Sequence, residues 1–146
     1  MRYLTKEWYM RCQSHPMSDE LKKELNGSAE SCWQARERED LPDALRRSFM
    51  FHDGSVLEVT ADTNFIIHIN SPYSKYHTIT FFDAVVKQEP PPVGAWWLYE
   101  ELYRHKSGVG YEAHILSWKA SKPMRKENLG SELFDTKIIC RDILLE

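Results

Sequence analysis

The spacing of hydrophobic and polar positions divides the chain into two parts. Over residues 1–52, apolar side chains recur every three or four positions, which is typical of helices with one buried face. From residue 53 onward, short runs rich in Val, Ile, Phe and Trp are separated by turn residues, which is typical of strands. Because no linker parts the two halves, we expect one α+β domain over residues 1–146, with a helical part (1–52) and a sheet part (53–146).

The helical part is expected to contain several short helices. Thr5 and Ser18 suit the N-cap position, because their side chains can accept a hydrogen bond from the first helical turn. The helix that begins after Ser18 is expected to stop at Asn26–Gly27, where glycine favours a helix end. A further helix then begins after Ser28 and ends before Pro42, since the residue before proline resists helical dihedrals.

Six hydrophobic runs without intervening helices predict an antiparallel meander of about six strands. The runs are VLEVTA, NFIIHIN, HTITFFDAVV, AWWLYEELYRH, YEAHILSW and LFDTKIICRDILL. The fourth run (96–104) also fits a helix, because Trp96, Tyr99 and Tyr103 fall at helical spacing. The segment SGVG between two runs of similar length favours a strand and a hairpin.

A two-residue turn at Ser107–Gly108 would fix the register of this hairpin. The expected cross-strand pairs are Tyr103 with Glu112, Glu101 with His114, Tyr99 with Leu116, and Trp97 with Trp118. Side chains alternate between the faces of a strand, so these residues share one face. The opposite face is mostly apolar and carries Trp96, Leu98, Glu100, Leu102, Ala113, Ile115 and Ser117. We expect the helices to cover that apolar face through Trp8, Leu21, Leu25 and Trp33.

The other face of the hairpin is expected to be partly exposed and is the candidate binding site. Its members are Trp97, Tyr99, Glu101, Tyr103, Glu112, His114 and Trp118. Aromatic side chains are enriched at the centres of protein interfaces and line ligand pockets. Cross-strand aromatic pairs also stabilise a sheet that has no site.

The same face carries one candidate acid–base group. A carboxylate beside an imidazole can orient it and raise its pKa, so Glu101, Glu112 and His114 could form an acid–base group. No nucleophile or oxyanion donor accompanies them, and we assign no catalytic residue. One histidine with carboxylates is a poor transition-metal site, so we expect no metal and no other cofactor. The pair His52–Asp53 is interpreted as turn sequence and not as part of a metal site.

Composition narrows the classes of partner and compartment. The net charge of −3 and the scattered basic residues argue against a nucleic-acid partner. No apolar run approaches the ~20 residues of a membrane span, and the first residues are too polar for a signal peptide. Cys12, Cys32 and Cys140 lack CxxC spacing, so we expect free thiols in a reducing cytoplasm. Walker, G-x-S-x-G, H-E-x-x-H and EF-hand motifs are missing from the sequence.

Five stretches carry a resemblance to a known family. They are MRYLTKEWY, FHDGSVLEV, WWLYEELY, YEAHILSW and DTKIIC, which together span nearly the whole chain. The sequence resembles the small bacterial proteins grouped as domain of unknown function 4085. The resemblance implies a bacterial cytosolic protein with one α+β unit, and it carries over no catalytic residues.

Three functional classes are compatible with the sequence. We expect first a non-enzymatic protein-interaction module, similar to an inhibitor or immunity protein, that uses the aromatic face. The second class is a small-ligand-binding protein with the same face as the pocket wall. The third is an enzyme that uses Glu101, Glu112 and His114 as acid–base groups. A homodimer is also plausible, because the edges of a sheet need cover.

Overall fold

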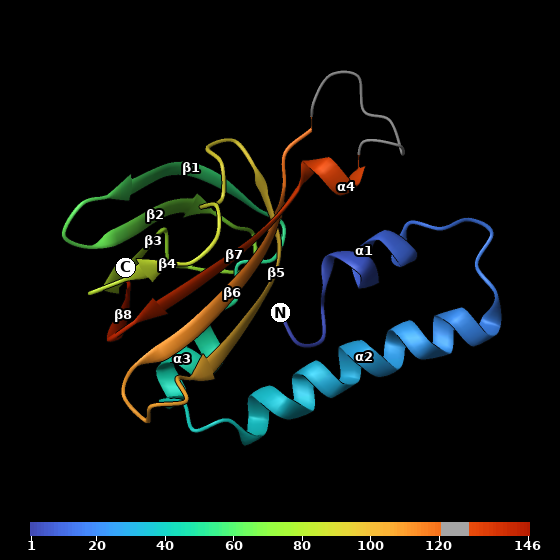
Figure 1. Ribbon diagram of the computed structural model, residues 1–146, viewed down its shortest axis with the longest axis horizontal. Coiled ribbons are helices and arrows are strands. Elements are labelled where there is room, and N and C mark those ends of the chain that lie inside the picture. The colour runs from blue at the N-terminus through green and yellow to red at the C-terminus, as the bar shows by residue number, and fades with distance from the viewer. Residues whose placement is uncertain (121–128) are drawn as a thin grey trace.

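The computed structural model describes residues 1–120 and 129–146 and shows an α+β fold, as expected (Figure 1). The helices are α1 (Lys6–Cys12), α2 (Asp19–Arg38), α3 (Asp43–Ser48) and α4 (Leu129–Glu132). The strands are β1 (Gly54–Ala61), β2 (Phe65–Asn70), β3 (Thr78–Phe82), β4 (Val85–Val86), β5 (Trp96–Arg104), β6 (Tyr111–Trp118), β7 (Leu133–Cys140) and β8 (Asp142–Leu145). The ambiguous run 96–104 is therefore a strand.

The strands form one antiparallel sheet of eight strands, and the expected number of about six was too low. Two expected runs are each divided in two: HTITFFDAVV forms β3 and β4, and LFDTKIICRDILL forms β7 and β8. Asp83, between β3 and β4, has a positive φ of 50°, which interrupts an extended strand. The strand order is β4-β7-β6-β5-β1-β2-β3-β8. Because β3 leads directly into β4, the two ends of this order lie near each other and the sheet curves back on itself (Figure 1).

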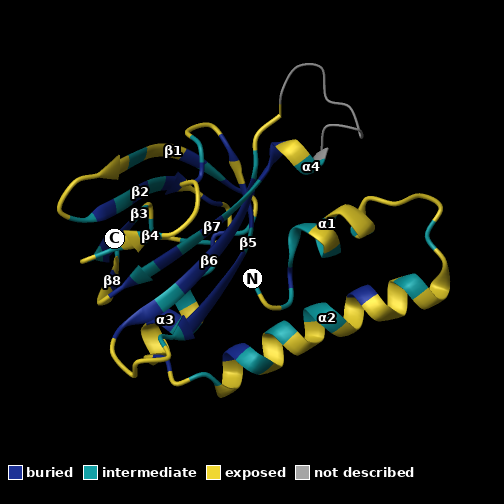
Figure 2. Ribbon diagram, viewed as in Figure 1, coloured by how far each residue is buried: buried dark blue, intermediate teal, exposed yellow. Residues whose placement is uncertain are grey.

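The main hydrophobic core lies inside the curved sheet. It is built from buried side chains of seven strands and of the segment that contains α3: Leu41, Leu45, Phe49, Phe51, Val56, Phe65, Ile67, Ile69, Ile79, Phe81, Trp97, Leu102, Tyr111, Ala113, Ile115, Ile138, Cys140 and Ile143. The inward positions of β5 and β6 were expected to be apolar, and Leu102, Ala113 and Ile115 confirm this. Figure 2 shows dark blue along β5 and most of β6, with dark blue and teal alternating along β7.

The two predicted N-caps are confirmed, but the predicted break in α2 is wrong. Thr5 Oγ1 accepts a hydrogen bond from Trp8 N (3.1 Å), and Ser18 Oγ accepts one from Leu21 N (3.2 Å). Helix α2 then runs for 20 residues without stopping at Gly27. Glycine costs a helix about 1 kcal/mol relative to alanine, and packing along one side of the helix outweighs that cost. Within the described residues, no helix is both long and apolar enough to cross a membrane.

The helices cover a different face of the sheet from the expected one. The N-terminal segment and α1 lie against the outer face of β5 and β6, where Leu98, Leu116 and Leu133 form a second apolar cluster with Met1 and Tyr9. Trp33, which was expected to cover the core, is 55% exposed on α2. The prediction was wrong because the curvature of the sheet and α3 already fill the apolar side, which leaves the outer face to the helices.

All three cysteines are free, as the sequence indicated. Cys140 is buried, whereas Cys12 and Cys32 are half-buried. Burial raises the pKa of the Cys32 thiol to about 12 and that of Cys140 to about 12. At neutral pH these thiols are protonated, and they pack as small apolar side chains.

Candidate functional site

The register of the β5–β6 hairpin places the seven predicted site residues. Three expected pairs are confirmed: Tyr103 with Glu112, Glu101 with His114, and Tyr99 with Leu116. The fourth is wrong, because the register shifts between Trp97 and Tyr99, so that Trp97 pairs with Ser117 and Trp96 with Trp118. Trp97 consequently faces the main core and is fully buried, while Trp96 is 48% exposed.

The turn of this hairpin is longer than expected, yet it has the same midpoint. The strands end at Arg104 and begin again at Tyr111, and His105 N donates to Gly110 O (3.1 Å). Gly110 has a φ of +77°, and a Cβ on it would lie 2.1 Å from Cys140 O, so the close approach to β7 requires glycine. Since the connection is centred on Ser107–Gly108, the predicted register holds for residues 99–116.

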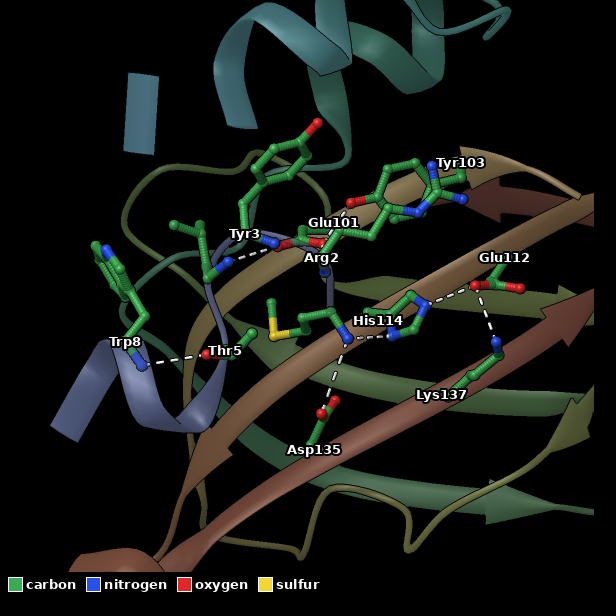
Figure 3. A network of polar contacts seen from close by, with 12 residues as sticks. Arg2, Tyr3, Thr5, Trp8, Glu101, Tyr103, Glu112, His114, Asp135 and Lys137 are labelled. Atoms are coloured by element: carbon green, nitrogen blue, oxygen red, sulfur yellow. Dashed lines mark hydrogen bonds and ion pairs between the residues drawn. The ribbon is translucent and has the colours of Figure 1, made fainter. Parts of the chain in front are cut away.

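Glu101 anchors the N-terminal segment to β5 (Figure 3). Its Oε1 accepts hydrogen bonds from the backbone N–H groups of Tyr3 (3.0 Å) and Leu4 (2.7 Å). Its Oε2 accepts from Arg2 N (2.6 Å) and from the Tyr103 hydroxyl. Burial alone would raise the pKa of Glu101, but these donors outweigh it and lower that pKa below its ordinary value.

His114 lies in a second set of contacts on the same face (Figure 3). Its Nδ1 is 2.8 Å from the Met1 amine, and its Nε2 is 2.8 Å from Glu112 Oε1, which Lys137 Nζ also contacts at 2.9 Å. Burial lowers the pKa of His114. Burial pushes the pKa of Glu112 upward, but the hydrogen bonds from His114 and Lys137 prevail and lower it to about 2. Both ring nitrogens of His114 are therefore occupied by groups of the protein.

The expected open face is thus covered. Glu101, Tyr103 and His114 are buried beneath the N-terminal segment, and Tyr99, Glu112 and Trp118 are half-buried. Among the seven predicted residues, only Tyr99 lines the pocket that lies between α1, α2 and β5. A binding role for the other six stays a prediction.

A pocket of about 740 Å³ lies between α1, α2, β5 and the segment that follows α3, and we name it the helix pocket. It is lined by Leu4, Trp8, Cys12, Met17, Lys22, Leu25, Asn26, Ala29, Cys32, Trp33, Arg36, Met50, His52, Tyr73, Tyr99 and Glu100. Most of these side chains are apolar or aromatic. The volume falls within the range of roughly 300–1,000 Å³ that is typical of small-molecule sites.

The helix pocket exists because β5 lacks a strand partner along most of one edge. β1 pairs with β5 only through Gly54–Trp97 and Ser55–Trp96 among the described residues. Beyond that point, side chains replace the missing strand: His52 Nδ1 contacts Leu98 O, and Arg104 N donates to Glu39 Oε1 (2.7 Å). Helix α2 passes along this side of the sheet (Figure 1). Residues of α2 and of β5 line the pocket from opposite sides.

Four aromatic rings form one wall of the helix pocket. Trp8 meets the Tyr99 ring edge to face at 5.2 Å, and His52 lies tilted against Tyr99 at 4.8 Å between ring centroids. Tyr73 stacks on His52 at 6.0 Å. Trp8 Nε1 also donates to Leu25 O (3.0 Å), which ties α1 to α2 beside the pocket. The wall is thus assembled from four separate segments of the chain.

Two oppositely charged side chains, Glu100 and Arg36, supply the buried polar groups of the pocket. Glu100 Oε2 accepts from Trp97 Nε1 (2.6 Å) and Phe51 N (3.4 Å). Arg36 donates through Nε to Arg46 O (2.9 Å) and through Nη2 to Phe49 O (2.6 Å). Burial raises the pKa of Glu100, and Arg36 offsets part of that effect. Burial also lowers the pKa of Arg36.

Sequence reasoning missed three of these residues. Glu100 was assigned to the apolar face and His52 to a turn without a role, and no role was assigned to Arg36. The turn itself is confirmed, because Gly54 N donates to Phe51 O (2.9 Å). One signal was available in the sequence: Leu25, Ala29, Cys32 and Arg36 continue one stripe at helical spacing, which places Arg36 on the packed side of α2.

Comparison of the chain with protein-family models, with curated proteins and with solved structures finds no match. The resemblance to domain of unknown function 4085 therefore stays a prediction.

Proposed function

We propose that this protein binds a small, largely apolar molecule in the helix pocket. The observation that carries the proposal is the combination of a 740 Å³ space, an aromatic wall and two buried charged groups in one place. Sites for small molecules typically join a mostly apolar lining to a few polar groups that fix orientation. The proposal keeps the ligand-binding alternative from the sequence and moves it from the sheet face to the pocket, with Tyr99 shared by both.

A protein-interaction module is the second candidate. It is favoured by two aromatic side chains at the pocket, Trp33 and Tyr73, which are 55% and 60% exposed. Exposed aromatics beside a hollow are a common anchor point for a partner's side chain. Homodimer formation, a cytoplasmic location and the lack of a nucleic-acid partner stay predictions. An enzymatic role for Glu101, Glu112 and His114 has less support, because none of the three lines the pocket.

A titration with Nile red, an uncharged apolar dye, tests the proposal. We expect saturable binding of one dye per chain with a rise in fluorescence. Replacement of the half-buried Ala29 by phenylalanine would fill the pocket, so Ala29→Phe should weaken binding about tenfold or more. Ser31→Phe adds the same ring to the exposed side of α2 and should leave binding unchanged.

Two results would overturn the proposal: no saturable binding, or equal loss of binding in both variants. Native mass spectrometry of the protein purified gently from its own cells separates the two candidates. A small adduct that is absent from the Ala29→Phe variant supports the binding of a small molecule in the helix pocket. A second protein in stoichiometric amount supports the protein-interaction module.

A further inference from the structure

We infer that the helix pocket selects an uncharged ligand whose head group presents a hydrogen-bond donor next to an acceptor, as a primary amide or a lactam does. The head group would lie between Glu100 and Arg36. The inference rests on the proposed function and names the class of molecule that the pocket takes.

Glu100 offers one free acceptor to the pocket. Both of its bonds to the protein, from Trp97 Nε1 and Phe51 N, end on Oε2. Within residues 1–120 and 129–146 no donor contacts Oε1, and that atom is not fully enclosed either. Since Glu100 lines the pocket and is only 9% exposed, the open space at Oε1 is the pocket. A ligand that carries an N–H group would satisfy this oxygen.

Arg36 offers a donor in the same pocket. Its Nε and Nη2 are held by the carbonyl groups of Leu45, Arg46 and Phe49, which fixes the plane of the guanidinium group. Nη1 has no acceptor in the described part of the chain, and it too keeps contact with open space. A fixed guanidinium group with one free nitrogen is suited to a carbonyl oxygen of a ligand.

The balance of charge argues against an ionised ligand. None of the ion pairs among the described residues joins Glu100 to Arg36, so the two charged groups are more than 4.0 Å apart and compensate each other only across a gap. A carboxylate placed in that gap would be repelled by Glu100, and an ammonium group would be repelled by Arg36. Unbalanced charge in a buried site is costly, whereas a neutral amide satisfies both side chains without adding charge.

The apolar body of such a ligand has an adjacent surface to cover. Tyr99 lines the same pocket as Glu100, and its ring contacts Trp8 and His52 in the pocket wall. The Tyr99 hydroxyl has no hydrogen-bond partner in the described residues and offers a third polar contact. The pocket therefore fits a molecule with an aromatic or aliphatic body and one polar end.

Three matched probes test the inference by isothermal titration calorimetry at pH 7.5. They share a naphthalene body and a three-carbon chain: 3-(2-naphthyl)propanamide, 3-(2-naphthyl)propanoate and 2-propylnaphthalene. We expect the amide to bind about tenfold more tightly, or better, than either of the others, because only the amide satisfies both free polar atoms.

The variant Glu100→Gln sharpens the test. The glutamine oxygen can still accept from Trp97 Nε1 and Phe51 N, so folding should be retained, but the charge that balances Arg36 is lost. The propanoate should then gain about tenfold in affinity relative to the amide. Glu58→Gln, on the exposed part of β1, is the matched control and should leave the order of the three probes unchanged.

The outcomes separate the inference from the proposed function. The three probes could bind with equal affinity to the wild-type protein and not at all to Ala29→Phe. That result would keep the helix pocket as the binding site and overturn the inference that it selects an uncharged, amide-like head group. Preference for the propanoate by the wild-type protein would overturn it as well. Absence of binding, or binding that Ala29→Phe does not weaken, would refute the proposed function itself. If Glu100→Gln does not fold, the ranking of the probes on the wild-type protein still decides.

Discussion

Glu100 and Glu101 are neighbours on β5 and both are buried, yet their surroundings differ in kind. Glu101 receives four hydrogen bonds, spread over both carboxylate oxygens, and its pKa is lowered. Glu100 receives two, both on one oxygen, and its pKa is raised. Burial disfavours the charged form of each: the four donors to Glu101 outweigh that effect, whereas the Arg36 charge and the two donors to Glu100 do not. A buried carboxylate with all its positions filled is an anchor, and one with a free oxygen is available to a ligand.

The two residues also differ in what they hold. Glu101 joins β5 to the backbone of residues 2–4, and this contact covers the outer face of the sheet. Glu100 faces the helix pocket, where the edge of β5 has no strand neighbour. Substitutions at these adjacent positions should therefore have opposite consequences for stability and for binding.

The largest effect is expected from Glu101→Ala. The substitution leaves the backbone N–H groups of Arg2, Tyr3 and Leu4 without their acceptor, and each unsatisfied buried group costs about 1–3 kcal/mol. We expect the free energy of unfolding in urea to fall by about 3 kcal/mol or more. A loss below about 1 kcal/mol would show that the N-terminal segment is not held by this carboxylate.

The dependence of stability on pH should follow the same division. Glu101 and Glu112 have lowered pKa values in the folded state, so their stabilisation is present above about pH 4.3, the ordinary value for Glu. It is lost as the pH falls through the folded-state pKa of each group, which for Glu112 is about 2. His114, whose pKa is also lowered, adds a loss that begins below about pH 6.5. Urea midpoints measured between pH 2 and 7 should decline toward acid. The decline should be shallower in Glu112→Gln, and an unchanged slope in that variant would contradict the assignment.

A smaller effect is expected from Thr5→Ala at the start of α1. The threonine hydroxyl accepts from Trp8 N, and loss of an N-cap typically costs about 1 kcal/mol. Because α1 follows the segment that Glu101 anchors, this change loosens only the helix and leaves the anchor intact. Urea denaturation of Thr5→Ser, which keeps the hydroxyl, provides the control and should match the wild type.

The smallest effect on stability is expected from Glu100→Gln. Its carboxyl group has a raised pKa, so ionisation costs stability as the pH rises above about 4.3, and an uncharged amide avoids that cost. The loss of the charge that faces Arg36 acts in the opposite direction, so at pH 7 we expect the free energy of unfolding to stay within about 1 kcal/mol of the wild type. A loss as large as that of Glu101→Ala would erase the distinction between the two carboxylates.

The sequence predicted the strands well where local pattern decides. The pairing of β5 with β6 was predictable between the Tyr99–Leu116 pair and the Tyr103–Glu112 pair, because the turn and the alternation of side chains determine the register there. The shift at Leu98 was not, because it depends on the packing of Trp97 against Phe49 and Phe51, which lie about 50 residues away in the sequence. That one-residue shift moved Trp97 from the predicted site into the core.

The position of the N-terminal segment could not be predicted for a different reason. The donors to Glu101 are backbone N–H groups, which any sequence except proline provides, so no side-chain pattern marks the contact. The helix pocket was hidden in a similar way, because its wall combines rings from four segments. Of the pocket lining, only the stripe along α2 with Ala29, Cys32 and Arg36 could be predicted from the sequence, because these residues recur at helical spacing.

The most direct test of the distinction between the two carboxylates is a titration of their side-chain carbons by NMR, with and without 3-(2-naphthyl)propanamide. We predict that Glu100 titrates above the ordinary pKa of a glutamate and Glu101 below it. We also predict that the probe shifts the resonance of Glu100 and leaves that of Glu101 in place. Titration of Glu100 at the ordinary value, or a probe response at Glu101 in place of Glu100, would contradict the assignment of one carboxylate to the pocket and the other to the anchor.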